Sequence, residues 1–145
     1  MSLQSLYQEQ ILDHGKRPRN FGKLPNATHR ASGTNAMCGD DLEVEIQLEE
    51  GRVRSISFTG SGCAISVASA SLMTELVEGM PVEEARELFK RFQASLVDPN
   101  SAEEIEGLEC FAGVKGHPSR IKCALLAWHA LNKAVEQNGE VSSSA

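Results

Sequence analysis

Three cysteines and one aspartate stand where a fold could gather them as metal ligands. Cys38 and Asp40 flank Gly39 in a loop, Cys63 follows a glycine-rich break, and Cys123 lies in the last helical stretch. The cysteines are 25 and 60 residues apart, so no local zinc-finger pattern exists and the fold must assemble any shared site. Three thiolates and one carboxylate can form a tetrahedral zinc site, in which the carboxylate is the harder ligand and exchanges most readily.

The backbone around two of these cysteines favours thiolates. Cys63 lies where a strand gives way to a helix, and Cys123 lies within the first two turns of another helix. A helix N-terminus carries partial positive charge and free N–H donors, so we expect lowered pKa values for both thiols. Spacing alone leaves a second interpretation open, in which the cysteines are inert core residues, because Cys123 lies on an apolar stripe.

The strands that must position the loop of Cys38 follow from alternating hydrophobicity. Residues 42–48 alternate apolar with acidic or amide side chains, which predicts a half-buried strand with its acidic face in water. Residues 53–59 predict a second strand, joined to the first in a hairpin through Glu50-Gly51. Residues 31–37 are a candidate third strand.

Helical spacing of apolar residues predicts four longer helices, and a capping-box pattern predicts a short one. The longer helices cover residues 3–15, 65–76, 82–96 (with Pro81 as first helical residue) and 118–134. Ser101 and Glu104 predict the short helix, which would carry Ile105 and Leu108. Strands followed by helices indicate an α+β fold, a small antiparallel three-stranded sheet with helices packed on one face.

Size and charge limit the classes of function. The 145 residues fit one domain, which we place at 1–138 with a disordered tail at 139–145. The chain lacks a secretory signal pattern and an apolar run of roughly 20 residues, so we expect a cytoplasmic protein with reduced thiols and no membrane span. A net charge of −6 argues against general nucleic-acid binding.

The charge is unevenly distributed. In residues 1–30, five basic side chains oppose two acidic ones, which gives +3 and leaves −9 for the remainder. The basic segment could dock an acidic partner protein, or it could be an ordinary solvated helix end and turn. The basic side chains are Lys16, Arg17, Arg19, Lys23 and Arg30.

The remaining cysteine and histidines have plainer interpretations. Cys110 matches no motif and is expected to be a structural thiol. His29 is expected in a surface loop, and His129 is rotated by about 120° from Cys123 on the helix and should miss the site. His117 precedes Pro118 and is expected to lead into the helix, although a role as an alternate ligand stays open.

The same residues carry a resemblance that covers nearly the whole chain. The matching stretches are LY and ILDH within residues 6–14, PRNFG at 18–22, CGD at 38–40, GSGCAIS at 60–66, ASASLMTE at 68–75 and RIKCALLAWH at 120–129. In these stretches the chain resembles the U-type iron–sulfur cluster assembly proteins (the family of IscU and the NifU N-terminal domain), and within them the SufU branch.

The resemblance implies a ligand set and a reaction. It implies zinc held by Cys38, Asp40, Cys63 and Cys123, with Cys38 accepting a persulfide sulfur from a pyridoxal-phosphate (PLP)-dependent cysteine desulfurase. The sulfur would pass to a downstream cluster-assembly complex, so the protein would be a sulfurtransferase-like carrier rather than a free-standing enzyme. A monomer or weak homo-oligomer is expected.

Two features favour the carrier branch. Scaffold members place a histidine ligand where this chain has Lys122, and their segment between the last two ligand cysteines is shorter. The chain departs from the usual pattern at Ala36, where proline is common, and at His117, where phenylalanine is common. Two alternatives remain: a scaffold that assembles a [2Fe–2S] cluster on the same residues, with iron in place of zinc, and a structural zinc module that binds a partner.

Overall fold

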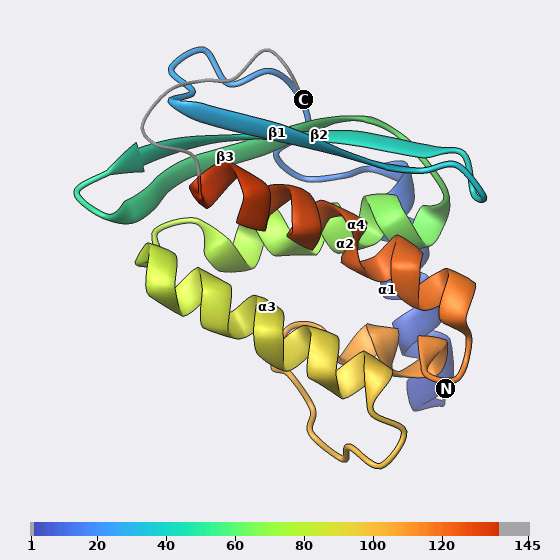
Figure 1. The fold of residues 1–145 in the computed structure, drawn as a ribbon. Coiled ribbons are helices and arrows are strands. Elements are labelled where there is room, and N and C mark those ends of the chain that lie inside the picture. Colours follow the sequence, from blue (N-terminus) through green and yellow to red (C-terminus); the bar gives the residue numbers. More distant parts are fainter. Residues whose placement is uncertain (1, 137–145) are drawn as a thin grey trace.

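Three consecutive strands form one antiparallel sheet in the order β1-β2-β3, and all the helices lie on one side of it (Figure 1). The computed structural model describes residues 2–136. Its elements are α1 (Leu3–Lys16), β1 (His29–Asn35), β2 (Asp40–Glu49), β3 (Arg52–Ser61), α2 (Ala64–Val77), α3 (Val82–Val97), the 3₁₀ helix η1 (Glu109–Val114) and α4 (Pro118–Val135). The predicted fold class and the third strand are therefore confirmed, while the predicted tail lies outside the described residues.

The inner face of the sheet forms the core. Leu42, Val44 and Ile46 alternate along β2 and are fully buried. Helix α4 lies against β1 and β2, and α2 lies against β3, so the two helices that carry Cys123 and follow Cys63 both contact the sheet. Packing of these apolar faces thus brings three segments toward one region. They are the β1–β2 connection with Cys38, the start of α2 with Cys63, and the first turns of α4 with Cys123.

The outer face of the sheet is crossed by the segment between α1 and β1. The Gly22 N–H donates to the Phe58 carbonyl of β3 at 2.9 Å, and the Thr28 N–H donates to the Ile46 carbonyl of β2 at 2.8 Å. Between these points Lys23 pairs with Glu43 and Glu45. The prediction that the acidic face of β2 lies in water is therefore wrong for Glu45, which is 1% exposed.

Most of the basic N-terminal side chains are engaged within the domain. Arg17 and Arg19 both pair with Asp13, at 2.6 and 2.7 Å. Lys23 and Arg30 pair with acidic residues of β2. The hydrogen bonds that Asp13 accepts, with the larger effect from Arg19 and the smaller from Arg17, hold the pKa of its carboxyl below the usual value of 3.8. The ion pairs favour the plain interpretation of this segment over a free docking surface.

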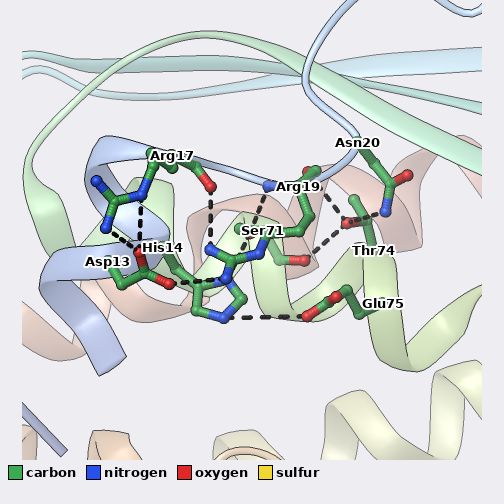
Figure 2. Close-up of polar contacts among 8 residues, drawn as sticks. All are labelled: Asp13, His14, Arg17, Arg19, Asn20, Ser71, Thr74 and Glu75. Atoms are coloured by element: carbon green, nitrogen blue, oxygen red, sulfur yellow. Dashed lines mark hydrogen bonds and ion pairs between the residues drawn. The ribbon is translucent and has the colours of Figure 1, made fainter. Parts of the chain in front are cut away.

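Polar contacts join α1 and the turn that follows it to α2 (Figure 2). Nδ1 of buried His14 lies 2.7 Å from the Ser71 hydroxyl, which also accepts a hydrogen bond from the Arg19 backbone N–H at 2.9 Å. The Asn20 side-chain amide donates to the Thr74 hydroxyl at 3.0 Å. The Ser71 hydroxyl can donate its proton to Nδ1 while it accepts from the Arg19 amide, an arrangement that fits a neutral imidazole at His14.

Three local predictions are wrong. The short helix predicted from Ser101 is absent from the described chain, because the Ser101 hydroxyl instead accepts from the Glu103 N–H in a turn and the next helix is η1. Pro81 is the N-cap of α3 rather than its first helical residue. His29 lies in β1 and is 5% exposed, not in a surface loop.

Candidate metal centre

Cys38 and Asp40 belong to the tight connection between β1 and β2. Asn35, the last residue of β1, pairs with Asp40, the first residue of β2, so only four residues join the strands. The Cys38 N–H donates to the Asn35 carbonyl at 3.2 Å, and Gly39 has a φ of +69°, a conformation that glycine adopts without strain. Cys38 is exposed at the tip, whereas Asp40 is 2% exposed at the base.

Cys63 is the N-cap of α2, as its position after a glycine-rich break predicts. Its backbone N–H donates to Oδ1 of Asp40 at 2.8 Å, and its sulfur lies 4.0 Å from Oδ2 of the same carboxylate. A Cβ at Gly62 would lie 2.7 Å from Asp40 Oδ1 and 2.5 Å from the Ser66 hydroxyl. The close approach of β2 to the start of α2 therefore requires glycine at position 62.

Cys123 lies on α4 and points into the same region. It is 2% exposed, and burial raises the pKa of its thiol, with further increases from the nearby side chains of Cys38, Asp40 and Cys63. The expected lowering of the Cys123 pKa is therefore wrong for the metal-free protein. Cys123 follows five helical residues, so loss of hydration outweighs the field of the helix end, which is felt within the first turn.

Three of the four predicted ligands, Cys38, Asp40 and Cys123, form one cluster, and Cys63 lies beside it. Ligand atoms of Cys38, Asp40 and Cys123 all lie within 4.8 Å of one another, and the Cys63 sulfur lies 4.0 Å from Asp40. Sulfur ligands around tetrahedral zinc, with Zn–S distances of about 2.3 Å, lie roughly 3.8 Å apart. Two thiols and a carboxylate at this spacing are a donor set that fits zinc, and Cys63 lies beside them at the position from which a fourth ligand would come.

Comparison with known proteins matches residues 6–142 to the family described as the NifU-like N terminal domain. This chain belongs to that family. It is therefore a member of the iron–sulfur cluster assembly proteins that include IscU and SufU, and the predicted resemblance is confirmed.

Individual relatives of this NifU-like domain have two kinds of name. The present chain is 38% identical to the zinc-dependent sulfurtransferase SufU of Bacillus subtilis, over 92% of each chain. It is 36% identical to the iron–sulfur cluster assembly scaffold protein IscU of Streptococcus pyogenes, over 94% of this chain and 86% of the relative.

A solved structure supports the fold. The protein from Fervidobacterium islandicum, named as an iron–sulfur cluster assembly scaffold protein for the SUF system, has a TM-score of 0.80 and 30% identity. The match covers 93% of this chain and 100% of that chain. No helix within residues 2–136 is both long and apolar enough to cross a bilayer.

The other candidates in the NifU-like domain lie apart from the centre. Cys110 is 3% exposed, and burial raises the pKa of its thiol to about 12, as expected of a structural thiol. His117 is exposed and is not among the side chains that converge at the centre within the described residues.

A groove lies beside the loop of Cys38. Its volume is about 710 Å³, and Asn35, Met37, Gln93, Val97 and Lys122 are among its lining residues. Met37, next to Cys38, is 83% exposed. One of these lining residues, Asn35, also has its side-chain amide nitrogen 3.7 Å from the Cys123 sulfur. The sequence does not indicate this contact, because it depends on how α4 packs against β1.

Proposed function

We propose that this chain is a zinc-dependent sulfur carrier, in which Cys38 receives sulfur from a cysteine desulfurase and relays it to a cluster-assembly complex. One observation carries the proposal: three thiols meet at one carboxylate, but they differ in exposure. Cys123 is buried on a helix, Cys63 is half-buried at a helix start, and Cys38 is exposed on a four-residue connection. A carrier needs one thiol that can reach a donor while the others stay in place.

One named relative and one sequence feature agree with this role. The relative from Bacillus subtilis is named a zinc-dependent sulfurtransferase. Lys122 stands directly before Cys123, is exposed, and cannot act as a ligand while protonated. The exposed ammonium offsets part of the negative charge that three thiolates and a carboxylate would place on one divalent ion.

The chemistry of the relay is a thiol exchange. Zinc, when bound by Cys38, Asp40, Cys63 and Cys123, would keep the three cysteine thiols deprotonated at neutral pH. The Cys38 thiolate attacks the outer sulfur of a persulfide on the donor. A new S–S bond forms at Cys38 while the donor's S–S bond breaks, and the donor cysteine leaves as a thiolate. One sulfur moves and no net oxidation occurs.

Persulfide loading tests this role directly. The protein is incubated with a PLP-dependent cysteine desulfurase and free cysteine, and the mass of each cysteine-containing peptide is measured without reductant. We expect one added sulfur on Cys38 and a faster desulfurase turnover. Cys38→Ser should abolish both effects, whereas Cys110→Ser, which removes a buried thiol outside the cluster, should retain them. Normal loading of the Cys38→Ser variant would contradict the proposal.

A cluster scaffold is the second candidate, because a relative of 36% identity is named a scaffold. The same four side chains could bind iron, since thiolates are ligands of both zinc and iron–sulfur clusters. A scaffold should develop the visible absorption of a [2Fe–2S] cluster with iron and sulfide and transfer the intact cluster to an apoprotein. A carrier should retain about one zinc and transfer sulfur alone.

A structural zinc module would behave differently from both. It should accept no sulfur, and chelation of its zinc should unfold it. The core argues against this third candidate, because the apolar face of the sheet packs on α2 and α4 in a core that includes none of the four proposed ligands. Circular dichroism before and after chelation distinguishes the cases.

A further inference from the structure

Asn35 contacts three of the four residues of the centre. Its backbone pairs with Asp40 across the β1–β2 connection, and its carbonyl accepts the Cys38 N–H at 3.2 Å. Its side-chain Nδ2 donates toward the Cys123 sulfur at 3.7 Å. We propose that Asn35 is a positioning residue of the metal centre, whose amide N–H holds the Cys123 thiolate in place. This inference rests on the metal binding in the proposed function.

The surroundings of Cys123 explain why a donor is needed there. A thiolate buried at 2% exposure has lost most of its hydration, and a buried anion is stabilised when it accepts a hydrogen bond. The side-chain amide of Asn35 has one oxygen, which only accepts, and one NH₂ group, which donates. The NH₂ group is therefore the end that can bond to the Cys123 sulfur. Because Asn35 is fixed through its backbone to β2, the amide approaches the sulfur from a rigid strand end.

The hydroxyl near the neighbouring cysteine is already engaged elsewhere. Ser66 Oγ lies 3.8 Å from the Cys63 sulfur, but it donates its proton to the Cys63 carbonyl at 3.0 Å. Within residues 2–136, Asn35 supplies the side-chain N–H that points at a sulfur of the centre. An N–H···S bond lowers the electron density on the sulfur and so makes the Cys123 thiolate a weaker nucleophile, while the fixed amide orients that sulfur toward the metal.

Cobalt substitution makes this bond visible without any sulfur transfer. Cobalt(II) in a thiolate site gives a sulfur-to-metal charge-transfer band, whose energy falls when a hydrogen bond to the sulfur is lost. We expect Asn35→Ala to shift this band to longer wavelength. Zinc affinity, measured by competition with a chromophoric chelator, should fall by roughly tenfold, as for other residues that orient metal ligands.

Asn35→Asp keeps the shape of the side chain but replaces the donor with a carboxylate. It should bind zinc more weakly than Asn35→Ala, because the new charge faces the Cys123 thiolate. The matched control is Gln93→Glu, which adds the same charge to the same groove. That variant should retain the wild-type band and an affinity within about twofold, because screening weakens charges that do not touch the centre.

The outcomes separate this inference from the function on which it rests. An unchanged band and affinity in Asn35→Asp would overturn the role of Asn35, even if Asn35→Ala fails to fold. Equal losses in both variants with an unmoved band would also overturn it, since they would indicate shape alone. Wild-type protein that binds neither metal would overturn both proposals. Wild-type protein that binds metal but accepts no sulfur would contradict the carrier function alone.

Discussion

The backbone N–H of Cys63 donates to Oδ1 of Asp40 at 2.8 Å, so the start of α2 and the start of β2 are joined by the carboxylate itself. The other carboxylate oxygen, Oδ2, lies 4.0 Å from the Cys63 sulfur. Asp40 therefore has a structural role with one oxygen, while the other is available as a ligand of the proposed centre. Its removal should affect both stability and metal binding.

Asp40→Ala should lower the stability of the metal-free protein and weaken zinc binding at least about tenfold. A hydrogen bond from a half-buried N–H to a charged acceptor contributes about 1.5–3 kcal/mol, which this variant loses. Thermal unfolding in the presence of a chelator measures the first effect, and competition with a chromophoric chelator measures the second. Asp41→Ala is the matched control, since Asp41 is the exposed next residue of β2 and its loss changes the charge equally. Equal behaviour of the two variants would contradict the role of Asp40.

Gly62→Ala should disrupt the centre although it replaces none of the proposed ligands. The added methyl group would lie 2.7 Å from Asp40 Oδ1 and 2.5 Å from Ser66 Oγ, so the carboxylate or the start of α2 must move. We expect zinc affinity to fall by about tenfold or more, comparable to a change in a residue that orients ligands. Gly113→Ala is the control, because its Cβ meets nothing within 4 Å. Wild-type affinity in Gly62→Ala would show that the approach of β2 and α2 is not limiting.

The four thiols should react with an alkylating reagent in a fixed order after zinc is chelated. Cys38 is exposed and should react first, whereas Cys110 is buried and has its pKa raised to about 12, so almost none of it is thiolate at pH 7.5. Time-resolved mass spectrometry of alkylated peptides gives the order. Unfolded protein, in which all four should react at similar rates, is the control. Early modification of Cys110 in folded protein would contradict the assignment of that residue to the core.

Much of the fold could be predicted because apolar spacing determines which face of each element is buried. The alternating apolar residues of β2 and the apolar stripe of α4 are buried, as their spacing predicts. The prediction at Ser101 is wrong because a hydroxyl can bond a nearby N–H in a turn as readily as at a helix cap, and the sequence does not distinguish the two. Glu45 is buried by a segment whose path across the sheet leaves no local pattern.

The sequence predicted which side chains would lie near one another, but it did not predict the energetics of the thiols. Glycines and helix starts indicate Cys38, Asp40 and Cys63, and the structure brings Cys123 to them. The direction of the Cys123 pKa shift was wrong, because burial depends on packing among α4, β1 and the loop rather than on position in the helix. Asn35 was missed for the same reason, since its approach to Cys123 joins residues that are 88 positions apart.

Acid should destabilise the metal-free protein through His14. Burial, with a smaller effect from Arg19, lowers the pKa of His14 below 6.5, although Glu75 and Asp13 oppose the shift. The unfolded state therefore binds the proton more readily, so stability is fully present above pH 6.5 and is lost as pH falls through the folded-state pKa. Thermal unfolding with a chelator at pH 7.5 and pH 5.5 measures the difference, above the range in which Asp13 titrates.

The matched variants are His14→Asn and His117→Asn. The first should lower stability at pH 7.5, because it disturbs the contact with the Ser71 hydroxyl, and it should flatten the pH dependence. Some dependence should remain, since burial also lowers the pKa of His129. His117 is exposed, so its replacement should leave the wild-type slope. A wild-type slope in His14→Asn would show that the imidazole of His14 is not the group that resists protonation.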